Sequence, residues 1–431
     1  MMASNFVEIT SKEMIKPSSS TPNHLRNFKL SFLDQIAPSM FIPLITFYEA
    51  AHSPNPQLLK QSLSDVLSKF YPLSGRFCGH DDLTVDCNDS GVSCIEARVH
   101  ANLSDVIKEP NMDEMKRYLP FSGIQVSSGG HNPIILALQI NVFDCGGTAI
   151  ALQMSHKVAD GTSLMNFMQA WAATCHGNSD DAAKFSPEFG LADLFPPKKL
   201  PENGCKPFPA DVITDEKIVT KRFVFDKEKV SKIKVAESYT AGKNLSRVEA
   251  ISVFLWRRFF EIAKAKKPTL KTIGAGHAVN LRGRMDPPLA NTTFGNIWIL
   301  SAQAIQDVDK KEDEKNEVLD LGGAMNNAIR KVSVDYVKKI QSGSAEFFNS
   351  LNQIPTQTSK GDGKDTQLSL FSSWCRFPLY ELDFGWGKPV WACTSTFPFD
   401  NAVILMSTGC GEGIEAWVNI VEKEESLLVV N

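Results

Sequence analysis

The spacing of apolar side chains predicts alternating helices and strands in the first half of the chain. Residues 57–69 repeat apolar side chains at helical intervals, and Pro72 ends this helix. Residues 133–142 and 148–154 are apolar, partly β-branched runs typical of strands, and Asp-Cys-Gly-Gly at 144–147 predicts a hairpin turn between them. A second helix should follow, with one buried stripe formed by Leu164, Phe167, Met168, Trp171 and Ala172.

The second half of the chain begins after a stretch that suits neither a helix nor a strand. Residues 195–209 contain five prolines, which predicts a linker between domains. The pattern then restarts with a strand at Ile218–Phe225 and helices at 226–239 and 247–264. These elements predict an α/β protein of two similar-sized domains. The expected division is an N-terminal domain at 1–194, a linker at 195–217 and a C-terminal domain at 218–431.

Charge and composition exclude several classes of protein. The 431 residues include 45 Lys and Arg against 49 Asp and Glu, a net charge of −4, which argues against a protein built to bind nucleic acid. No apolar run approaches the roughly 20 residues of a transmembrane helix, and the first residues lack the pattern of a secretory signal. Nine cysteines without a CxxC pair suit reduced thiols. We therefore expect a soluble, cytoplasmic protein.

The common metal and nucleotide motifs are missing from the sequence. The eight histidines include no pair at the spacing of HExxH and none beside a cysteine pair. The chain has no Walker GxxxxGK[ST] sequence and no GxSxG nucleophile elbow. We therefore expect no metal and no permanently bound cofactor.

One short segment carries candidate chemistry, the sequence HKVADG at 156–161, where a predicted strand ends and a helix begins. Histidine is the side chain best suited to accept a proton near neutral pH, so His156 is a candidate general base. Asp160 follows four residues later and is close enough to fix the local geometry. The pattern alone leaves an alternative open, in which His156 is a polar residue at a strand end and Asp160 caps the helix.

A second segment, DFGWGKP at 383–389, has the composition of a scaffold. Two glycines flank Trp386, and a proline closes the segment, which predicts a rigid and tightly turned loop. Asp383 is its one plausible acid or base. We therefore interpret this segment as structural.

Together, the two motifs and their positions resemble those of the BAHD acyltransferases, the plant acyl-CoA-dependent acyltransferases. Within the family, the chain is most similar to the alkaloid O-acetyltransferases. The resemblance implies two chloramphenicol-acetyltransferase-like α/β domains with a solvent channel between them. Further matching segments, spread over about residues 6–420, are SFLDQ at 31–35, YPLSGR at 71–76, VDCNDSG at 85–91, SRVEA at 246–250 and VNLR at 279–282.

The resemblance also implies roles for individual residues. His156 is the implied general base, and Asp160 is implied to form a structural ion pair with Arg282. Ser246 matches a position on the CoA side of the channel, but it is equally suited to cap a helix together with Glu249.

Other positions are implied to line the channel or to support it. Asn296 matches a family asparagine near the channel, either an oxyanion donor or a turn-stabilising residue. The implied CoA-side residues in the second half are Ser372, Ser373 and Trp374. The implied structural motif consists of Asp383, Gly385, Trp386 and Gly387.

The implied activity is acyl transfer by a monomeric enzyme without a metal. The co-substrate is acetyl-CoA, and the acceptor is a hydroxyl group of a plant specialised metabolite, with an alkaloid favoured. The alternative is a non-catalytic or repurposed family member that binds a small metabolite or promotes a cyclisation or elimination.

Overall fold

Two compact units make up the part of the chain that the computed structural model describes. The described residues are 6–49, 55–78, 83–121, 134–198, 216–306, 308, 319–343 and 366–428. Unit 1 consists of Met1–Lys198, Leu289–Ile297 and Phe377–Ser395, and unit 2 of Lys199–Pro288, Trp298–Arg376 and Thr396–Asn431. Most of the predicted linker at 195–217 lies outside the described residues.

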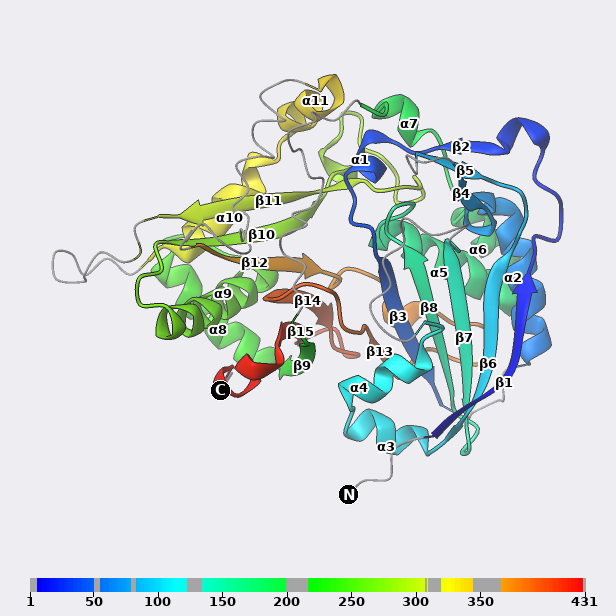
Figure 1. Cartoon of the computed structure of the whole chain (residues 1–431), viewed down its shortest axis with the longest axis horizontal. Coiled ribbons are helices and arrows are strands. Elements are labelled where there is room, and N and C mark those ends of the chain that lie inside the picture. The colour runs from blue at the N-terminus through cyan, green and yellow to red at the C-terminus, as the bar shows by residue number, and fades with distance from the viewer. Residues whose placement is uncertain are drawn as a thin grey trace. The chain divides into compact units, whose positions relative to one another are not determined.

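Unit 1 is built on a mixed six-stranded sheet. Its strands are β1 (Phe6–Ile15), β3 (Phe41–Tyr48), β6 (Val92–His100), β7 (Leu136–Phe143), β8 (Thr148–Ser155) and β13 (Trp391–Cys393). Their order is β1-β6-β7-β8-β3-β13, and all neighbours are antiparallel except β6 and β7 (Figure 1). A small second sheet contains β2 (Asn27–Lys29), β4 (Arg76–Cys78) and β5 (Thr84–Asp86).

The described part of unit 1 contains seven α-helices, and the two longest pack against each other. They are α1 (Phe32–Gln35), α2 (Pro56–Lys69), α3 (Leu103–Lys108), α4 (Met112–Met115), α5 (Gly161–His176), α6 (Ser179–Lys184) and α7 (Leu191–Leu194). Helices α2 and α5 lie side by side (Figure 1). Trp171 of α5 is fully buried and donates its Nε1 proton to the carbonyl of Leu59, 3.2 Å away. Both predicted helices are thus confirmed, and their predicted apolar residues are buried except Leu58 of α2, which is exposed.

The predicted hairpin is the pair β7 and β8, which are antiparallel and joined by a turn at 144–147. All side chains of β8 are buried, as expected for a central strand covered on both faces. The strand ends at Ser155, so His156 follows at the edge of the sheet.

Unit 2 contains a second mixed six-stranded sheet. Its strands are β9 (Ile218–Phe225), β10 (Thr272–Asn280), β11 (Trp298–Ile305), β12 (Thr366–Ser373), β14 (Ala402–Ser407) and β15 (Ile414–Val421). The order is β11-β10-β12-β14-β15-β9, with β12 parallel to both of its neighbours. The helices are α8 (Lys227–Thr240), α9 (Arg247–Lys266), α10 (Leu321–Lys331) and α11 (Val334–Ser342).

The core of unit 2 forms where α9 packs against the sheet. Trp256 and Phe259 of this helix are buried together with apolar residues of the strands, such as Ile273 and Leu405. The strand predicted at Ile218–Phe225 is β9, and the helices predicted at 226–239 and 247–264 are α8 and α9. Asp226 accepts a hydrogen bond from Lys229 N and is the N-cap of α8 rather than its first residue. Both units therefore have the predicted α/β class.

Two late segments of the chain pack in unit 1, although the sequence-based division places them in the C-terminal domain. Strand β13 pairs with β3, and the ring of Trp391 stacks on that of Phe47 with 5.1 Å between centroids. In the segment Leu289–Ile297, Thr293 forms a β-bridge with Glu188. The division differs because these pairings join residues that are far apart in the sequence, and local patterns do not report such pairings.

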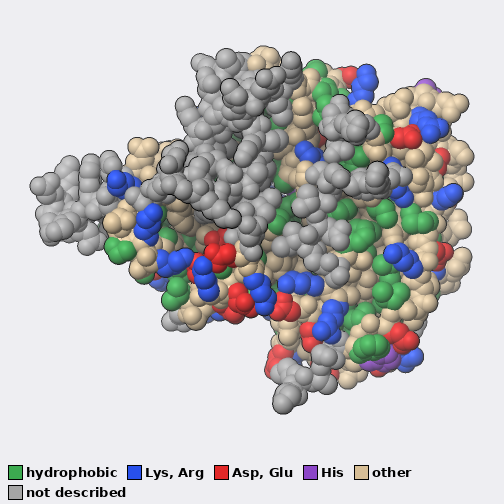
Figure 2. Space-filling model, in the orientation of Figure 1, with side chains coloured by type: hydrophobic (Ala, Val, Ile, Leu, Met, Phe, Trp, Pro, Cys, Tyr) green, Lys and Arg blue, Asp and Glu red, His purple; other side chains and the backbone are tan. Residues whose placement is uncertain are grey.

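The described surface carries charges of both signs. On the face drawn in Figure 2, Lys and Arg side chains lie interspersed with Asp and Glu side chains. Ion pairs of this kind include Lys217 with Glu422 and Arg98 with Asp144. Among the described helices, none combines the length and apolar character of a membrane span.

Candidate active site

His156 is held directly after β8 by backbone contacts within unit 1. Its N–H donates to the carbonyl of Met40, 2.8 Å away, and the neighbouring Lys157 donates its Nζ proton to the carbonyl of Gln35 at 2.9 Å. Burial lowers the pKa of the His156 imidazole below its usual value of 6.5. The ring is therefore neutral at neutral pH, which is the state that a proton acceptor needs.

Asn296 determines which ring nitrogen of His156 carries the proton. Its Oδ1 lies 3.0 Å from His156 Nδ1, while its Nδ2 donates to the carbonyl of His156 at 2.7 Å. These contacts assign the amide orientation, because an amide nitrogen donates and an amide oxygen accepts. The neutral imidazole therefore donates from Nδ1, and Nε2 is the ring nitrogen that carries the proton-accepting lone pair.

The contacts of Asn296 favour one of the two roles that the sequence leaves open for it. Nδ2 donates to the carboxylate of Asp34 as well as to the carbonyl of His156, at 2.9 and 2.7 Å. Both amide protons thus have acceptors within unit 1, and Asn296 has no further amide proton to offer an oxyanion. The geometry fits a residue that orients His156.

Asp34 is a buried residue of this cluster whose role the sequence reading missed. It belongs to α1 and forms a capping box with Ser31, in which Ser31 Oγ accepts from Asp34 N. The Ser-x-x-Asp spacing at 31–34 is a known signature of this box, so the cap was readable from the sequence. Its contact with Asn296 was not, because 262 positions separate the two residues.

Asp160 binds backbone N–H groups rather than the ring of His156. Its Oδ1 accepts from Ser163 N at 2.8 Å, as an N-cap of α5, and its Oδ2 accepts from Ile297 N at 3.0 Å. The predicted capping role of Asp160 is confirmed. The side chain also ties the start of α5 to the segment that carries Asn296, so it supports the site structurally.

Arg282, the predicted ion-pair partner of Asp160, belongs to unit 2. It is buried at the start of a short 3₁₀ turn, Arg282–Arg284, where its N–H donates to Asn280 Oδ1 at 2.9 Å. The predicted pair would join the two units and remains a prediction.

The DFGWG segment forms a compact loop in unit 1. Asp383 Oδ1 accepts from the N–H groups of Gly385 and Gly387, at 2.8 and 3.0 Å. Both glycines have a positive φ, 106° and 111°, which side chains rarely adopt. The ring of Phe384 is buried and contacts Trp386 and Trp171, with centroids 5.5 and 4.9 Å away. These contacts are those of a scaffold, as the sequence predicts.

The predicted CoA-side residues all lie in unit 2. Ser246 forms the predicted capping box with Glu249, with Oγ accepting from Glu249 N at 3.2 Å. Ser372 and Ser373 are half-buried at the end of β12, and Trp374 is buried just after it. The cap at Ser246 is thus confirmed, whereas contacts of these four residues with CoA remain predictions.

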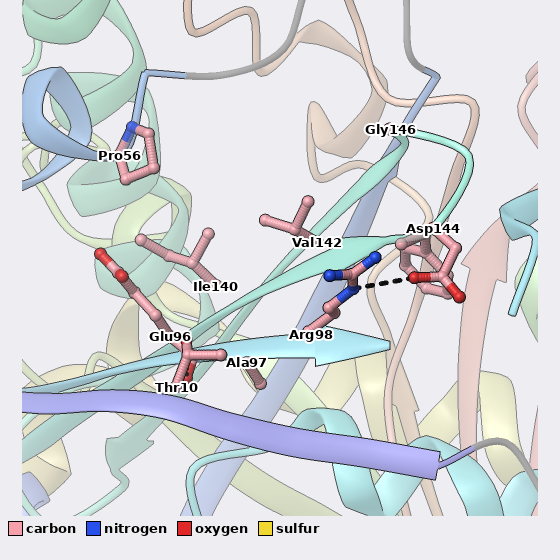
Figure 3. Close-up of a pocket in the computed structure, with 10 residues that line it drawn as sticks. Thr10, Pro56, Glu96, Ala97, Arg98, Ile140, Val142, Asp144 and Gly146 are labelled. Carbon is pink, nitrogen blue, oxygen red and sulfur yellow. Dashed lines mark hydrogen bonds and ion pairs between the residues drawn. The ribbon is translucent and has the colours of Figure 1, made fainter. Parts of the chain in front are cut away.

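A separate hollow of about 290 Å³ lies on the sheet of unit 1. It is lined in part by Ile140 and Val142, and by Arg98, which is paired with Asp144 at 2.9 Å (Figure 3). Glu96, which also lines the hollow, is paired with Lys60. Neither His156 nor Asn296 lines it. Because these charged side chains pair with one another, we do not consider the hollow a candidate active site.

Comparison with known proteins identifies relatives over the whole chain. The sequence model of the Transferase family matches residues 5–429. The chain is 41% identical to stemmadenine O-acetyltransferase from Catharanthus roseus, over 98% of this chain and 96% of that protein. It is 40% identical to vinorine synthase from Rauvolfia serpentina over the same shares, and 35% identical to limonoid 1-O-acetyltransferase from Citrus sinensis, over 96% and 94%.

A solved structure shows the same fold. The crystal structure of vinorine synthase matches with a TM-score of 0.80 at 38% identity, covering 99% of this chain and 97% of that chain. The α/β fold class expected from the sequence is thus confirmed, and so is the family that its motifs indicate. The chain belongs to the Transferase family and is a BAHD acyltransferase.

Proposed function

We propose that this enzyme transfers an acetyl group from acetyl-CoA to a hydroxyl group of a plant specialised metabolite, with His156 as the general base. The observation that carries the proposal is the hydrogen bond between His156 Nδ1 and Asn296 Oδ1, because it leaves Nε2 as a proton acceptor. Relatives named as O-acetyltransferases support the acyl group and the type of acceptor atom.

The chemistry follows from the two functional groups that react. An alcohol has a pKa far above 7, so removing its proton during attack accelerates the reaction by roughly 10²–10⁴. Nε2 of His156 takes this proton while the alcohol oxygen forms a bond to the thioester carbonyl carbon. The tetrahedral intermediate then collapses, its C–S bond breaks, and the thiolate of CoA recovers the proton from His156. The products are the ester and free CoA.

We propose an alkaloid alcohol as the acceptor. The support is the similarity to vinorine synthase and stemmadenine O-acetyltransferase at about 40% identity through both units. A limonoid alcohol is the second candidate, because a limonoid 1-O-acetyltransferase is also similar over nearly the whole chain. Both are bulky acceptors that suit an apolar pocket with few polar groups.

A competition assay tests the proposed substrates. The purified enzyme is offered acetyl-, malonyl-, benzoyl- and coumaroyl-CoA against alkaloid, limonoid, phenolic and shikimate acceptors, and kcat/KM is measured for each pair. We expect the highest value for acetyl-CoA with an alkaloid alcohol, together with release of free thiol and a mass gain of one acetyl group. A preference for an aromatic donor with an acidic acceptor would contradict the proposal.

The alternative function, binding or rearrangement of a metabolite without acyl transfer, is tested by the same assay. It predicts no thiol release with any donor. The hydrogen bond that orients the His156 ring through Nδ1 favours the transferase, because a mere binding protein has no use for an oriented base.

The reaction should not depend on a metal ion. In the described part of the chain, no group of three His, Cys, Asp or Glu side chains is arranged to hold a metal. A thioester is also sufficiently activated for attack by an alcohol with a base. Acetyl transfer is therefore expected to be unchanged after extensive dialysis against EDTA, whereas inactivation that zinc reverses would contradict this expectation.

A further inference from the structure

We infer that Asp34 is a positioning residue for His156, because it holds the amide of Asn296 in the orientation that presents Oδ1 to the imidazole. Asp34 Oδ1 accepts two hydrogen bonds from Asn296, from the backbone N at 2.8 Å and from Nδ2 at 2.9 Å. The three residues thus form a continuous chain from a buried carboxylate to the ring. The inference rests on the proposed role of His156 as the base.

The carboxylate itself is anchored on its other oxygen. Asp34 Oδ2 accepts from Ser31 N and Ser31 Oγ, at 2.8 and 2.6 Å. Each carboxylate oxygen of Asp34 therefore accepts two hydrogen bonds. Such a set of partners fixes the carboxylate in one rotamer, and with it the side chain of Asn296.

Burial makes the ionised form of the Asp34 carboxyl group less favourable than it is in water. Asp34 is 2% exposed, and burial raises the pKa of its carboxyl group to about 6. It is still ionised at neutral pH and offers only acceptors there. A capping box alone does not require this burial, since Glu249 of α9 accepts the same type of bond from Ser246 N at a half-buried position.

The orientation of Asn296 matters because the two ends of its amide have opposite effects. With Oδ1 toward the ring, His156 must donate from Nδ1, and Nε2 is the base. With Nδ2 toward the ring, Nδ1 would have to accept, the proton would move to Nε2, and the base would be lost at that atom. Asp34 and the carbonyl of His156 are the two acceptors that prevent this reversal.

The experiment reads the position of the proton directly. His156 is observed by ¹⁵N NMR in protein labelled at histidine, and its ring signals are assigned by their loss in His156→Gln. In the wild type we expect a neutral ring protonated at Nδ1. Asp34→Leu keeps the branched shape but removes both acceptors, and we expect a substantial Nε2-protonated fraction. The same variant should lower kcat roughly tenfold, with little change in KM for acetyl-CoA.

Two further variants separate positioning from general stability. Asp34→Asn keeps one oxygen that can face Asn296, so it should retain the Nδ1 tautomer and most of kcat. Asp400→Leu is the matched control in unit 2, where a half-buried carboxylate accepts from Asn401 N, Asn401 Nδ2 and Val421 N, and its pKa is likewise raised to about 6. This control should lower the melting temperature without moving the ring signals of His156.

The outcomes distinguish the inference from the proposed function. A wild-type ring protonated at Nε2, or an Asp34→Leu ring identical to the wild type, would overturn the role of Asp34. If the leucine variant does not fold, Asp34→Ser removes Oδ1 and decides the same question. Absence of acetyl transfer by the wild type would instead refute the proposed function, while the ring signals would still report whether Asp34 sets the tautomer.

Discussion

Replacing His156 by alanine is expected to reduce acetyl transfer at least about a hundredfold while leaving the fold intact. The loss follows from the role of Nε2, because an alcohol attacks a thioester slowly when no base removes its proton. The fold should survive because His156 follows the last residue of β8 and is half-buried, so its side chain is not part of the buried strand. The comparison to make is kcat/KM of the purified variant against the wild type, with circular dichroism and thermal melting as checks on folding.

The pH dependence of the wild type provides an independent test of the same assignment. Burial lowers the pKa of His156 below 6.5, and only the neutral imidazole accepts a proton. The value of kcat/KM should therefore be constant around neutral pH and fall as the pH decreases through a value below 6.5. His100→Ala, which removes an exposed histidine that pairs with Glu8 and Asp144, should leave this profile unchanged.

For the alanine variant of His156, activity above about a hundredth of the wild-type value would refute the assignment of His156 as the base.

Replacing Asp160 by alanine is expected to destabilise the protein by about 2–4 kcal/mol, rather than to remove a catalytic group. One part of the loss is the N-cap of α5, typically about 1 kcal/mol. The other part is the unpaired N–H of Ile297, whose burial costs about 1–3 kcal/mol without an acceptor. Thermal and denaturant unfolding should show a lower midpoint, and the soluble yield should fall.

A matched substitution separates the two contributions of Asp160. Asp226→Ala removes an N-cap of the same kind from α8, where the side chain accepts only from Lys229 N among the described bonds. It should cost about 1 kcal/mol and thus less than Asp160→Ala. If Asp160→Ala instead melted like the wild type but had lost its activity, a catalytic relay between Asp160 and His156 would replace the structural role.

The local structure around the site follows from patterns that a sequence displays directly. Apolar spacing places β8 and α5 on either side of residues 156–160, and the short side chain of Asp160 is a good N-cap because its carboxylate reaches the N–H three residues on. The capping box at Ser246 is readable for the same reason. These features depend on residues at most a few positions apart, so a short stretch of sequence is enough to predict them.

The DFGWG loop shows which features local sequence patterns predict and which they do not. Its glycines and proline correctly predict a tight turn, and Asp383 closes that turn through bonds to N–H groups two and four residues away. The strand that follows the loop, β13, pairs instead with β3 more than 300 positions earlier. Both strands are apolar, and an apolar pattern does not specify its partner.

The state of His156 depends on tertiary structure in the same way. The motif alone presents a histidine able to exchange a proton, but it does not say which nitrogen holds that proton. Asn296, 140 positions away, sets the tautomer, and Asp34, 262 positions from Asn296, orients that amide. A hydrogen bond needs its donor and acceptor within about 3 Å in a defined direction. Residue types and local periodicity therefore indicate the base, and only the folded chain brings together the groups that determine how it is presented.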